Sequence, residues 1–307
     1  MKAFANWVMK GRMQAVIAAT VLAVLALLIT PLALLSAAVI MLTVFRQGGQ
    51  EGALVVGSAL LAIAGLGGLL FQMPVAIALI GAALWLPAAA LGSVLGRTGS
   101  LRVAIEMAAI GAALIVVLQY LLISDPAAYW EEMLNEFIVR RLNDEAQAAS
   151  NLGPLIELMA GWMAGGVAAA WFLGTTVSLL LARYWGSLID RPGAFGEEFR
   201  QLRFGRWLLL LVPVLVVAAM LLGGDRPSML AQFYVIGLVL FMLQGISVAH
   251  GLVNEFGASP GWLAGLYLTL VLVAPQGATM VSLFGYADGW LDFRARARAR
   301  RSGTDDT

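Results

Sequence analysis

The stretch that decides the fold is GALVVGSALLAIAGLGGLLFQMPVAIALIGAALWLPAAALGSVLG, from Gly52 to Gly96. It contains 45 residues and no Asp, Glu, Lys or Arg. A helix that spans a bilayer needs roughly 20 mainly apolar residues, so this stretch is long enough for two. The segment FQMP, Phe71 to Pro74, lies near its middle, and proline favours a break there. We therefore predict two membrane helices that meet at this segment.

The composition of the whole chain points in the same direction. Of its 307 residues, 61% are hydrophobic and 12% are charged, whereas a typical soluble domain has about 25% charged residues. So much apolar surface has to face lipid, where helices satisfy the backbone internally. We predict an all-α, polytopic integral membrane helical bundle, a single domain over residues 1–307, with eight to nine transmembrane helices. The predicted apolar helices are Met13–Thr30, the short Pro31–Phe45, two within Gly52–Gly96, Leu101–Ile123, Leu158–Ala182, Trp207–Gly224, Met229–Val253 and Gly261–Leu283.

The acidic segment Asp125–Glu157 has a different pattern. Asp125 followed by Pro126 is typical of a helix start, with an N-cap and then proline at the first helical position. Apolar residues then recur at helical spacing, which predicts an amphipathic helix on the membrane surface or over the bundle. These residues are Trp130, Met133, Leu134, Phe137 and Ile138. The excess of acidic residues favours an external, extramembrane position for this segment.

The basic residues predict the orientation, because Lys and Arg in short loops favour the cytoplasmic side. The N-terminal Lys2, Lys10 and Arg12 precede a long apolar run, which favours a retained signal anchor with the N-terminus in the cytoplasm. The multi-pass topology fits a bacterial inner membrane. The segment 183–206 and the tail 288–307, which includes RARARARR, are expected to be cytoplasmic as well.

These basic segments conflict with a full count of crossings. The first six predicted helices fit them in order, but three more crossings would place the basic tail outside. Either one late segment does not cross fully, or one loop breaks the rule. Pro275 makes the last apolar run, Phe256–Ala287, the suspect segment.

Several classes of function have no support in the sequence. The net charge of +1 gives no reason to expect a nucleic-acid partner. The chain has no cysteine and one histidine, which excludes thiolate and multi-histidine metal sites. No P-loop, dinucleotide fingerprint or zinc-protease motif occurs. We therefore predict no catalytic residues, no metal and no cofactor, and we do not expect an enzyme.

Ionisable and polar residues inside membrane runs are the candidates for ligand binding. Glu106 lies about one turn inside its predicted helix, with Arg102 four residues earlier, so an interfacial ion pair is the alternative. Gln244, His250 and Asn254 lie in another run, and His250 and Asn254 share one helix face. They could contact a substrate or carry a proton. The alternative for His250 is a hydrogen bond between helices.

The segment RYWGSLIDRPGAFGEEFRQLRFGR, Arg183 to Arg206, gathers charge between two apolar runs. Tyr184 and Trp185 lie where a helix leaves the bilayer, as in an aromatic belt. Pro192-Gly193 predicts a break. Phe195, Phe199 and Leu202 then recur at helical spacing, which indicates a short interfacial helix. We call this segment the elbow and predict that it lies at the cytoplasmic surface.

The elbow resembles the hallmark of the YybS-like family of predicted bacterial membrane proteins, a domain of unknown function. The matching positions are Arg183, Trp185, Pro192, Gly193, Phe195, Glu198 and Phe199. The chain departs from the family pattern at Arg191 and Ala194. The tail DGWLDFR resembles the family's ending, and we call it the tail motif. Its matching positions are Asp288, Trp290, Asp292, Phe293 and Arg294.

The resemblance implies a limited set of functions. The family's N-terminal pattern is similar to substrate-binding S components of energy-coupling-factor transporters, including the short helix that Pro31 begins. It implies small-molecule binding or transport, with an energising partner. The alternative is a non-enzymatic envelope scaffold that docks a membrane or cytoplasmic protein through the elbow and the basic tail. In both cases the lipid bilayer is a partner.

Overall fold

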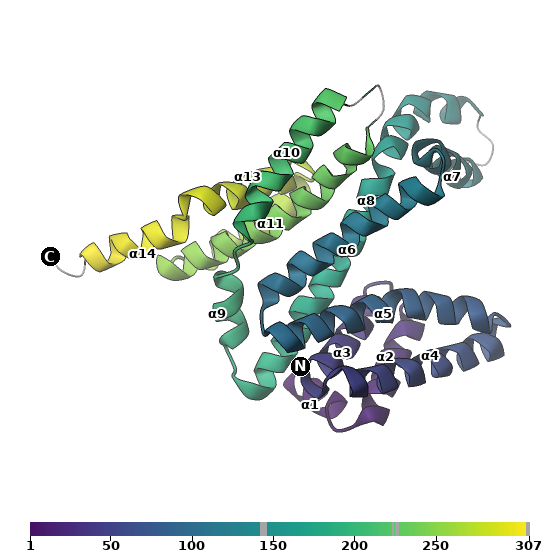
Figure 1. Ribbon diagram of the computed structural model, residues 1–307, viewed down its shortest axis with the longest axis horizontal. Helices are drawn as coiled ribbons and strands as arrows, with labels where there is room; N and C mark the ends of the chain where they lie inside the picture. Colours follow the sequence, from purple (N-terminus) through teal and green to yellow (C-terminus); the bar gives the residue numbers. More distant parts are fainter. Residues whose placement is uncertain (142–145, 223, 225–226, 305–307) are drawn as a thin grey trace. The chain divides into compact units, whose positions relative to one another are not determined.

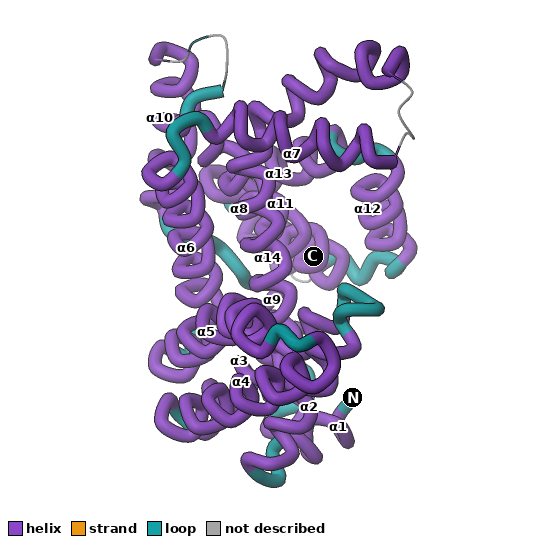
Figure 2. The backbone as a smooth tube through the Cα atoms, turned by 90° about the vertical axis from the view of Figure 1, so that its right-hand side faces the viewer, coloured by secondary structure: helices purple, strands orange, loops and turns teal. Residues whose placement is uncertain are grey.

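The protein is built from α-helices (Figures 1 and 2). The structure is a computed structural model that describes residues 1–141, 146–222, 224 and 227–304. Those residues form fourteen helices and no strand, which confirms the all-α prediction. The helices are α1 (Lys2–Val8), α2 (Arg12–Leu25), α3 (Leu32–Gln47), α4 (Gly49–Phe71), α5 (Pro74–Thr98), α6 (Leu101–Leu122), α7 (Pro126–Arg141), α8 (Ala146–Asp190), α9 (Ala194–Arg200), α10 (Arg206–Leu222), α11 (Met229–Glu255), α12 (Gly261–Leu272), α13 (Gln276–Leu291) and α14 (Phe293–Thr304).

The residue contacts divide the chain into two compact units. Unit 1 contains Met1–Ala108 and Leu173–Phe199. Unit 2 contains Ala109–Phe172 and Arg200–Thr307. The boundaries at Ala108 and Phe172 fall inside α6 and α8, so both helices contribute to both units. No loop or change of composition marks these two boundaries, and the sequence therefore predicts one domain only.

Among the described residues, five helices are long and apolar enough to cross a membrane. They are α4, α5, α6, α8 over Leu152–Asp190, and α11, and a sixth would be added if α1 and α2 formed one bent span. A multi-pass membrane protein is therefore supported, with fewer spans than the eight to nine predicted. The other apolar helices are shorter, because α3, α10 and α12 have 16, 17 and 12 residues. At 1.5 Å per residue they reach about 24, 26 and 18 Å, less than the bilayer core of about 30 Å.

In unit 1, the first apolar run folds into a short hairpin. Helix α2 ends at Leu25, before the predicted Thr30, and α3 begins directly after Pro31. The Ser36 hydroxyl donates to the Ala19 carbonyl at 2.7 Å and accepts from the Trp85 indole at 2.9 Å, which ties the hairpin to α5. The arms of the hairpin are about 21 and 24 Å long, each shorter than the bilayer core of about 30 Å.

The next two helices follow the prediction closely. Helix α4 ends at Phe71 and α5 begins at Pro74 (Figure 1). Gln72 has a positive φ of 56°, and the N–H groups of Gln72 and Met73 donate to the carbonyls of Gly68 and Gly67. This left-handed turn satisfies the last carbonyls of α4. Pro74 then occupies the first position of α5, where its missing N–H costs nothing.

In unit 2, the predicted amphipathic helix is α7. The Asp125 carboxylate accepts from the Ala128 N–H at 3.0 Å, which confirms the predicted N-cap. The Trp130 indole donates to Gln119 of α6 at 3.1 Å, whereas the side chains of Met133 and Phe137 are exposed. One part of α7 thus packs over the bundle. Residues 142–145 of the acidic segment lie outside the described residues.

The last apolar run is divided into two short helices. Helices α12 and α13 meet at Val273–Pro275, where Gly277 lies against the Thr269 carbonyl. Helices α13 and α14 run beside α11 in the same direction (Figure 1). Arg298 of α14 lies 3.8 Å from Glu255, at the end of α11. The run therefore leaves one end of α11 and returns to it, as expected if a late segment fails to cross.

Candidate functional site

Arg183 and Glu198, two charged residues of the elbow, are bound within unit 1. The Arg183 guanidinium donates to the Glu198 carboxylate at 2.7 Å and lies 5.3 Å from the centre of the Phe45 ring. The second oxygen of Glu198 accepts from the Leu101 N–H at 3.1 Å, at the start of α6. This pair connects α8 with α9, and its contacts with Phe45 and Leu101 connect both helices to α3 and α6. Its first role is therefore to hold the elbow in place.

The aromatic residues of the elbow also have neighbours within the unit. Trp185 is 2% exposed and packs edge-on against Phe4 of α1, with ring centres 5.3 Å apart. The centre of the Phe195 ring lies 5.6 Å from the centre of the Tyr184 ring and 5.9 Å from that of the Phe199 ring. Pro192 precedes Gly193, whose φ of +96° allows the tight turn between α8 and α9. The break at Pro192-Gly193 and the short helix after it follow the prediction, whereas Trp185 is buried in the protein and does not form part of an aromatic belt.

The tail motif contains a buried ion pair in unit 2. Arg294 donates to Asp288 at 2.7 Å, and their side chains are 6% and 0% exposed. Arg294 also donates to the carbonyls of Arg200 and Leu202, at 2.8 and 3.0 Å. The other Asp288 oxygen accepts from the Phe293 N–H at 3.0 Å. This pair ties the start of α14 to the chain segment that precedes α10.

A second ion pair supports the same junction. Arg203 donates to Asp292 at 2.6 Å and to the Gly289 carbonyl at 2.8 Å. Burial alone would raise the pKa of Asp292, but hydrogen bonds from the Ala295 N–H and from Arg203 outweigh it and hold this pKa below its usual range. Phe293 stacks on Phe284 at 5.3 Å, and Trp290 remains exposed.

Of the four predicted ligand-binding residues, three lie on α11 in unit 2 and one lies on α6 in unit 1. Gln244 is buried in unit 2, where it accepts from the Phe204 N–H at 2.9 Å and donates to the Gly285 carbonyl at 2.7 Å. His250 lies 2.9 Å from the Tyr267 hydroxyl, the contact between helices given as its alternative. Asn254 lies one turn further along α11 and is exposed. Glu106 belongs to unit 1 and pairs with Arg102 at 2.9 Å.

Sequence reasoning missed a buried glutamine. Gln232 of α11 donates to the Gly161 carbonyl at 2.7 Å and accepts from the Gly165 N–H at 2.8 Å. Gly161 and Gly165 lie four residues apart on α8, and their small size allows α8 to approach this side chain closely. The signal available in the sequence was the polar side chain of Gln232 within an apolar run. The contacts of Gln232 are those of a helix-packing residue.

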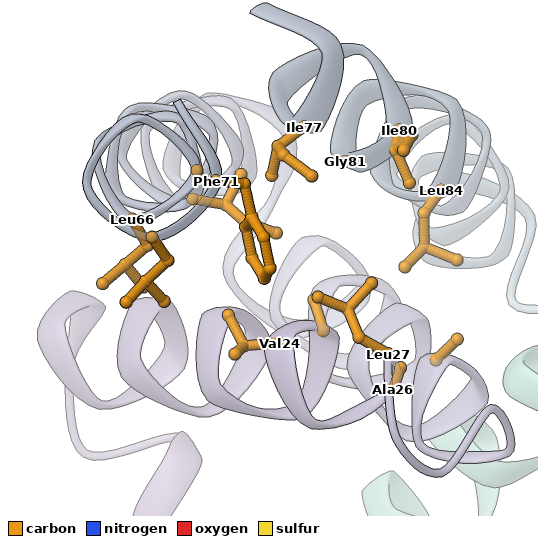
Figure 3. A pocket seen from close by; sticks show the side chains of 14 residues that line it. Val24, Ala26, Leu27, Leu66, Phe71, Ile77, Ile80, Gly81 and Leu84 are labelled. Carbon is orange, nitrogen blue, oxygen red and sulfur yellow. The ribbon is translucent and has the colours of Figure 1, made fainter. Parts of the chain in front are cut away.

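A cavity of about 200 Å³ lies in unit 1. Its fourteen lining residues are all apolar or glycine, and they come from α2 and the turn after it, the start of α3, the second half of α4 and the first half of α5. Figure 3 shows Phe71 of α4 and Ile77 of α5 pointing into the same space as Val24 and Leu27. Sequence reasoning missed this cavity, because apolar residues that line a cavity and those that fill a core have the same pattern.

A metal site requires several ligating side chains close together. Among the described residues, no three His, Cys, Asp or Glu side chains lie close enough together to hold a metal ion.

No family model, curated protein or solved structure matches the chain. The cavity, the elbow and the tail motif are therefore the features that bear on function.

Proposed function

We propose that the protein binds an apolar small molecule within the membrane, as the substrate-binding part of a transport system would, and that the cavity of unit 1 is the site. The observation that carries this proposal is a space of about 200 Å³ lined entirely by hydrocarbon side chains and glycine. No ionisable residue lines it, so catalysis at this site is not part of the proposal.

The physical argument concerns what could fill such a space. A water molecule needs two to four polar partners, and an apolar cavity of about 150 Å³ stays dry and binds benzene. An empty cavity forfeits dispersion contacts on its inner wall. A hydrocarbon group restores those contacts without desolvating any polar atom. The volume is below the roughly 300–1,000 Å³ of drug-sized sites, which favours a slender or small ligand.

The proposal includes an orientation in a bacterial inner membrane. In unit 1, Arg12 pairs with Glu51, Arg46 with Asp190 and Arg183 with Glu198. These pairs lie at the end of the unit away from the α4–α5 turn. The positive-inside rule places that end, the N-terminus and the elbow in the cytoplasm. The resemblance to S components supports a role that needs a separate energising partner.

The test uses the protein purified in mild detergent. Ala26→Phe and Ala33→Phe add bulk inside the cavity, whereas Ala76→Phe adds the same bulk on an exposed face of α5. Organic extracts of each preparation are compared by mass spectrometry. We expect an apolar compound that is retained by the natural protein and by the Ala76→Phe control but lost from both filled variants. Equal retention by all four proteins, or none by any, would refute the proposal.

A docking scaffold remains the second candidate, because both signature segments leave charge at the surface. Arg191 and Glu197 of the elbow are exposed, and so is Arg296 of α14. Replacing Phe195 or Phe199 would disturb packing inside unit 1, so charge reversal of Arg191 and Arg296 is the sharper test. A partner that binds here should crosslink to the natural protein and not to the reversed variant. Unchanged crosslinking would argue against this role.

A further inference from the structure

The cavity exists because the α2–α3 hairpin is short. Helices α4 and α5 have 23 and 25 residues, or about 35 and 38 Å. The hairpin turns at Ala26–Pro31, after an arm of only about 21 Å. The distal halves of α4 and α5 therefore continue past the hairpin tip, and the space beside them is incompletely filled.

The wall of the cavity is buried on one side and open on the other. Ile63 at its base is 5% exposed, and Gly67 and Gly81 are also buried. At its rim, Leu70 and Ile80 are 62% and 61% exposed. The way into the cavity therefore passes between exposed apolar side chains. In a bilayer such side chains face lipid tails and not water, so a ligand arrives sideways from the membrane.

No charge near the cavity could hold a polar headgroup. No Asp, Glu, Lys or Arg occurs from Met13 to Phe45 or from Gly52 to Gly96, the two segments that supply every lining residue. The charged pairs of unit 1 lie at its opposite end. Recognition in this cavity must therefore come from shape and dispersion contacts.

We propose that the cavity takes one hydrocarbon chain of a membrane lipid, which enters from the leaflet away from the arginine-rich end. This inference rests on the proposed function and names the class of ligand. The chain lies between the hairpin tip and the distal halves of α4 and α5, and the headgroup stays at the membrane surface. Binding then depends on the chain and not on the charge of the headgroup.

The experiment places the whole protein in phosphatidylcholine vesicles. A trace of phosphatidylcholine with a photoreactive diazirine at mid-chain is added, the sample is irradiated, and the labelled residues are mapped by mass spectrometry. We expect adducts concentrated on the cavity wall. Ala26→Phe combined with Ala33→Phe should lower them about tenfold, the effect of losing about 1.4 kcal/mol of binding free energy. Ala76→Phe should leave them unchanged.

A further variant and a second lipid distinguish specific binding in the cavity from other causes of labelling. Leu84→Ala enlarges the cavity without adding bulk and should increase the labelling, which protects the test against misfolding of the filled variant. Phosphatidylglycerol with the same photoreactive chain should label the same residues to the same extent. Labelling spread evenly over the exposed faces of α4 and α5, or labelling that follows headgroup charge, would overturn the inference. A non-lipid compound retained on purification would then still support the proposed function.

Discussion

At the scale of single residues, the tail motif is dominated by the Asp288–Arg294 pair. Both side chains are almost fully buried, and each makes additional hydrogen bonds to the backbone. Such a pair gains little over an apolar pair of the same size, because both charges lose their hydration. Removing one partner is far more costly, since the other charge remains buried without compensation.

We therefore predict that Asp288→Ala lowers the free energy of unfolding by about 3–5 kcal/mol. Thermal unfolding in detergent, followed by tryptophan fluorescence, measures the change. Asp288→Leu combined with Arg294→Met is the control, and it should recover most of the loss because no unpaired charge remains. If the double variant is as unstable as the single one, the pair matters for reasons other than its charge.

The Asp292–Arg203 pair predicts a pH dependence for the docking of α14. Its partners hold the pKa of Asp292 below the unfolded value of about 3.9. A depressed carboxyl pKa adds stability that is present above the unfolded pKa and is lost as pH falls through the folded pKa. We expect the start of α14 to loosen below about pH 4.

A nitroxide attached at Arg296→Cys reports this change by electron paramagnetic resonance, and the cysteine-free chain needs no other substitution. In an Asp292→Asn background the label should already be more mobile at neutral pH and should respond less to acid. An identical pH response in both backgrounds would contradict a role for this carboxylate.

At the scale of elements, glycine decides how closely α11 and α13 approach. A methyl group added at Gly285 would collide with the Phe241 carbonyl and the Gly245 N–H, and one added at Gly245 would collide with the Val281 carbonyl. In lipid, small residues allow helices to gain contacts along their backbones. The buried Gln244 bridges the same two helices through the Gly285 carbonyl.

Gly285→Ala should therefore destabilise unit 2 by about 1–3 kcal/mol, the usual cost of overpacking a filled interface. Gly265→Ala is the matched control, because its added methyl group meets nothing within 4 Å and its helix has no buried residue. The control should change stability by less than about 0.5 kcal/mol. Chemical unfolding of both variants in the same detergent compares them, and equal stabilities would show that α11 and α13 can separate freely.

At the scale of the whole molecule, the return of the chain after α11 determines the side on which the tail lies. If α12 and α13 turn back at Val273–Pro275, the α11–α12 turn and α14 face the same side of the membrane. A full crossing would separate them. If α10 also crosses the membrane, this arrangement removes the conflict between the basic tail and the positive-inside rule.

Single cysteines at Ser259, Arg296 and Gln72 test this arrangement in intact cells. We expect a membrane-impermeant maleimide to label the Gln72→Cys protein at once and the other two only after the membrane is opened. Opposite behaviour of Ser259→Cys and Arg296→Cys would show that the last run crosses completely. Labelling of all three in intact cells would contradict the proposed orientation.

Local signals in the sequence were sufficient for the elements they govern directly. Asp125 caps α7, Pro74 begins α5 and Pro192-Gly193 turns the elbow, because each of these features depends on neighbouring residues. The number of spans was predicted less well. Composition identifies apolar segments but does not show where a helix ends within one, and Gly261–Leu283, predicted as one helix, is divided between α12 and α13.

By itself, the sequence determined that the chain is helical and apolar enough to span a membrane, because its long uncharged runs can satisfy their backbone groups in lipid as helices. Only the tertiary structure decided where space remains among those helices. Ile63 and Leu70 belong to the same apolar pattern, yet one is buried at the base of a cavity and the other forms its rim. Hydrophobicity fixes the solvent that a side chain prefers, whereas a cavity depends on the relative lengths and packing of helices far apart in the sequence.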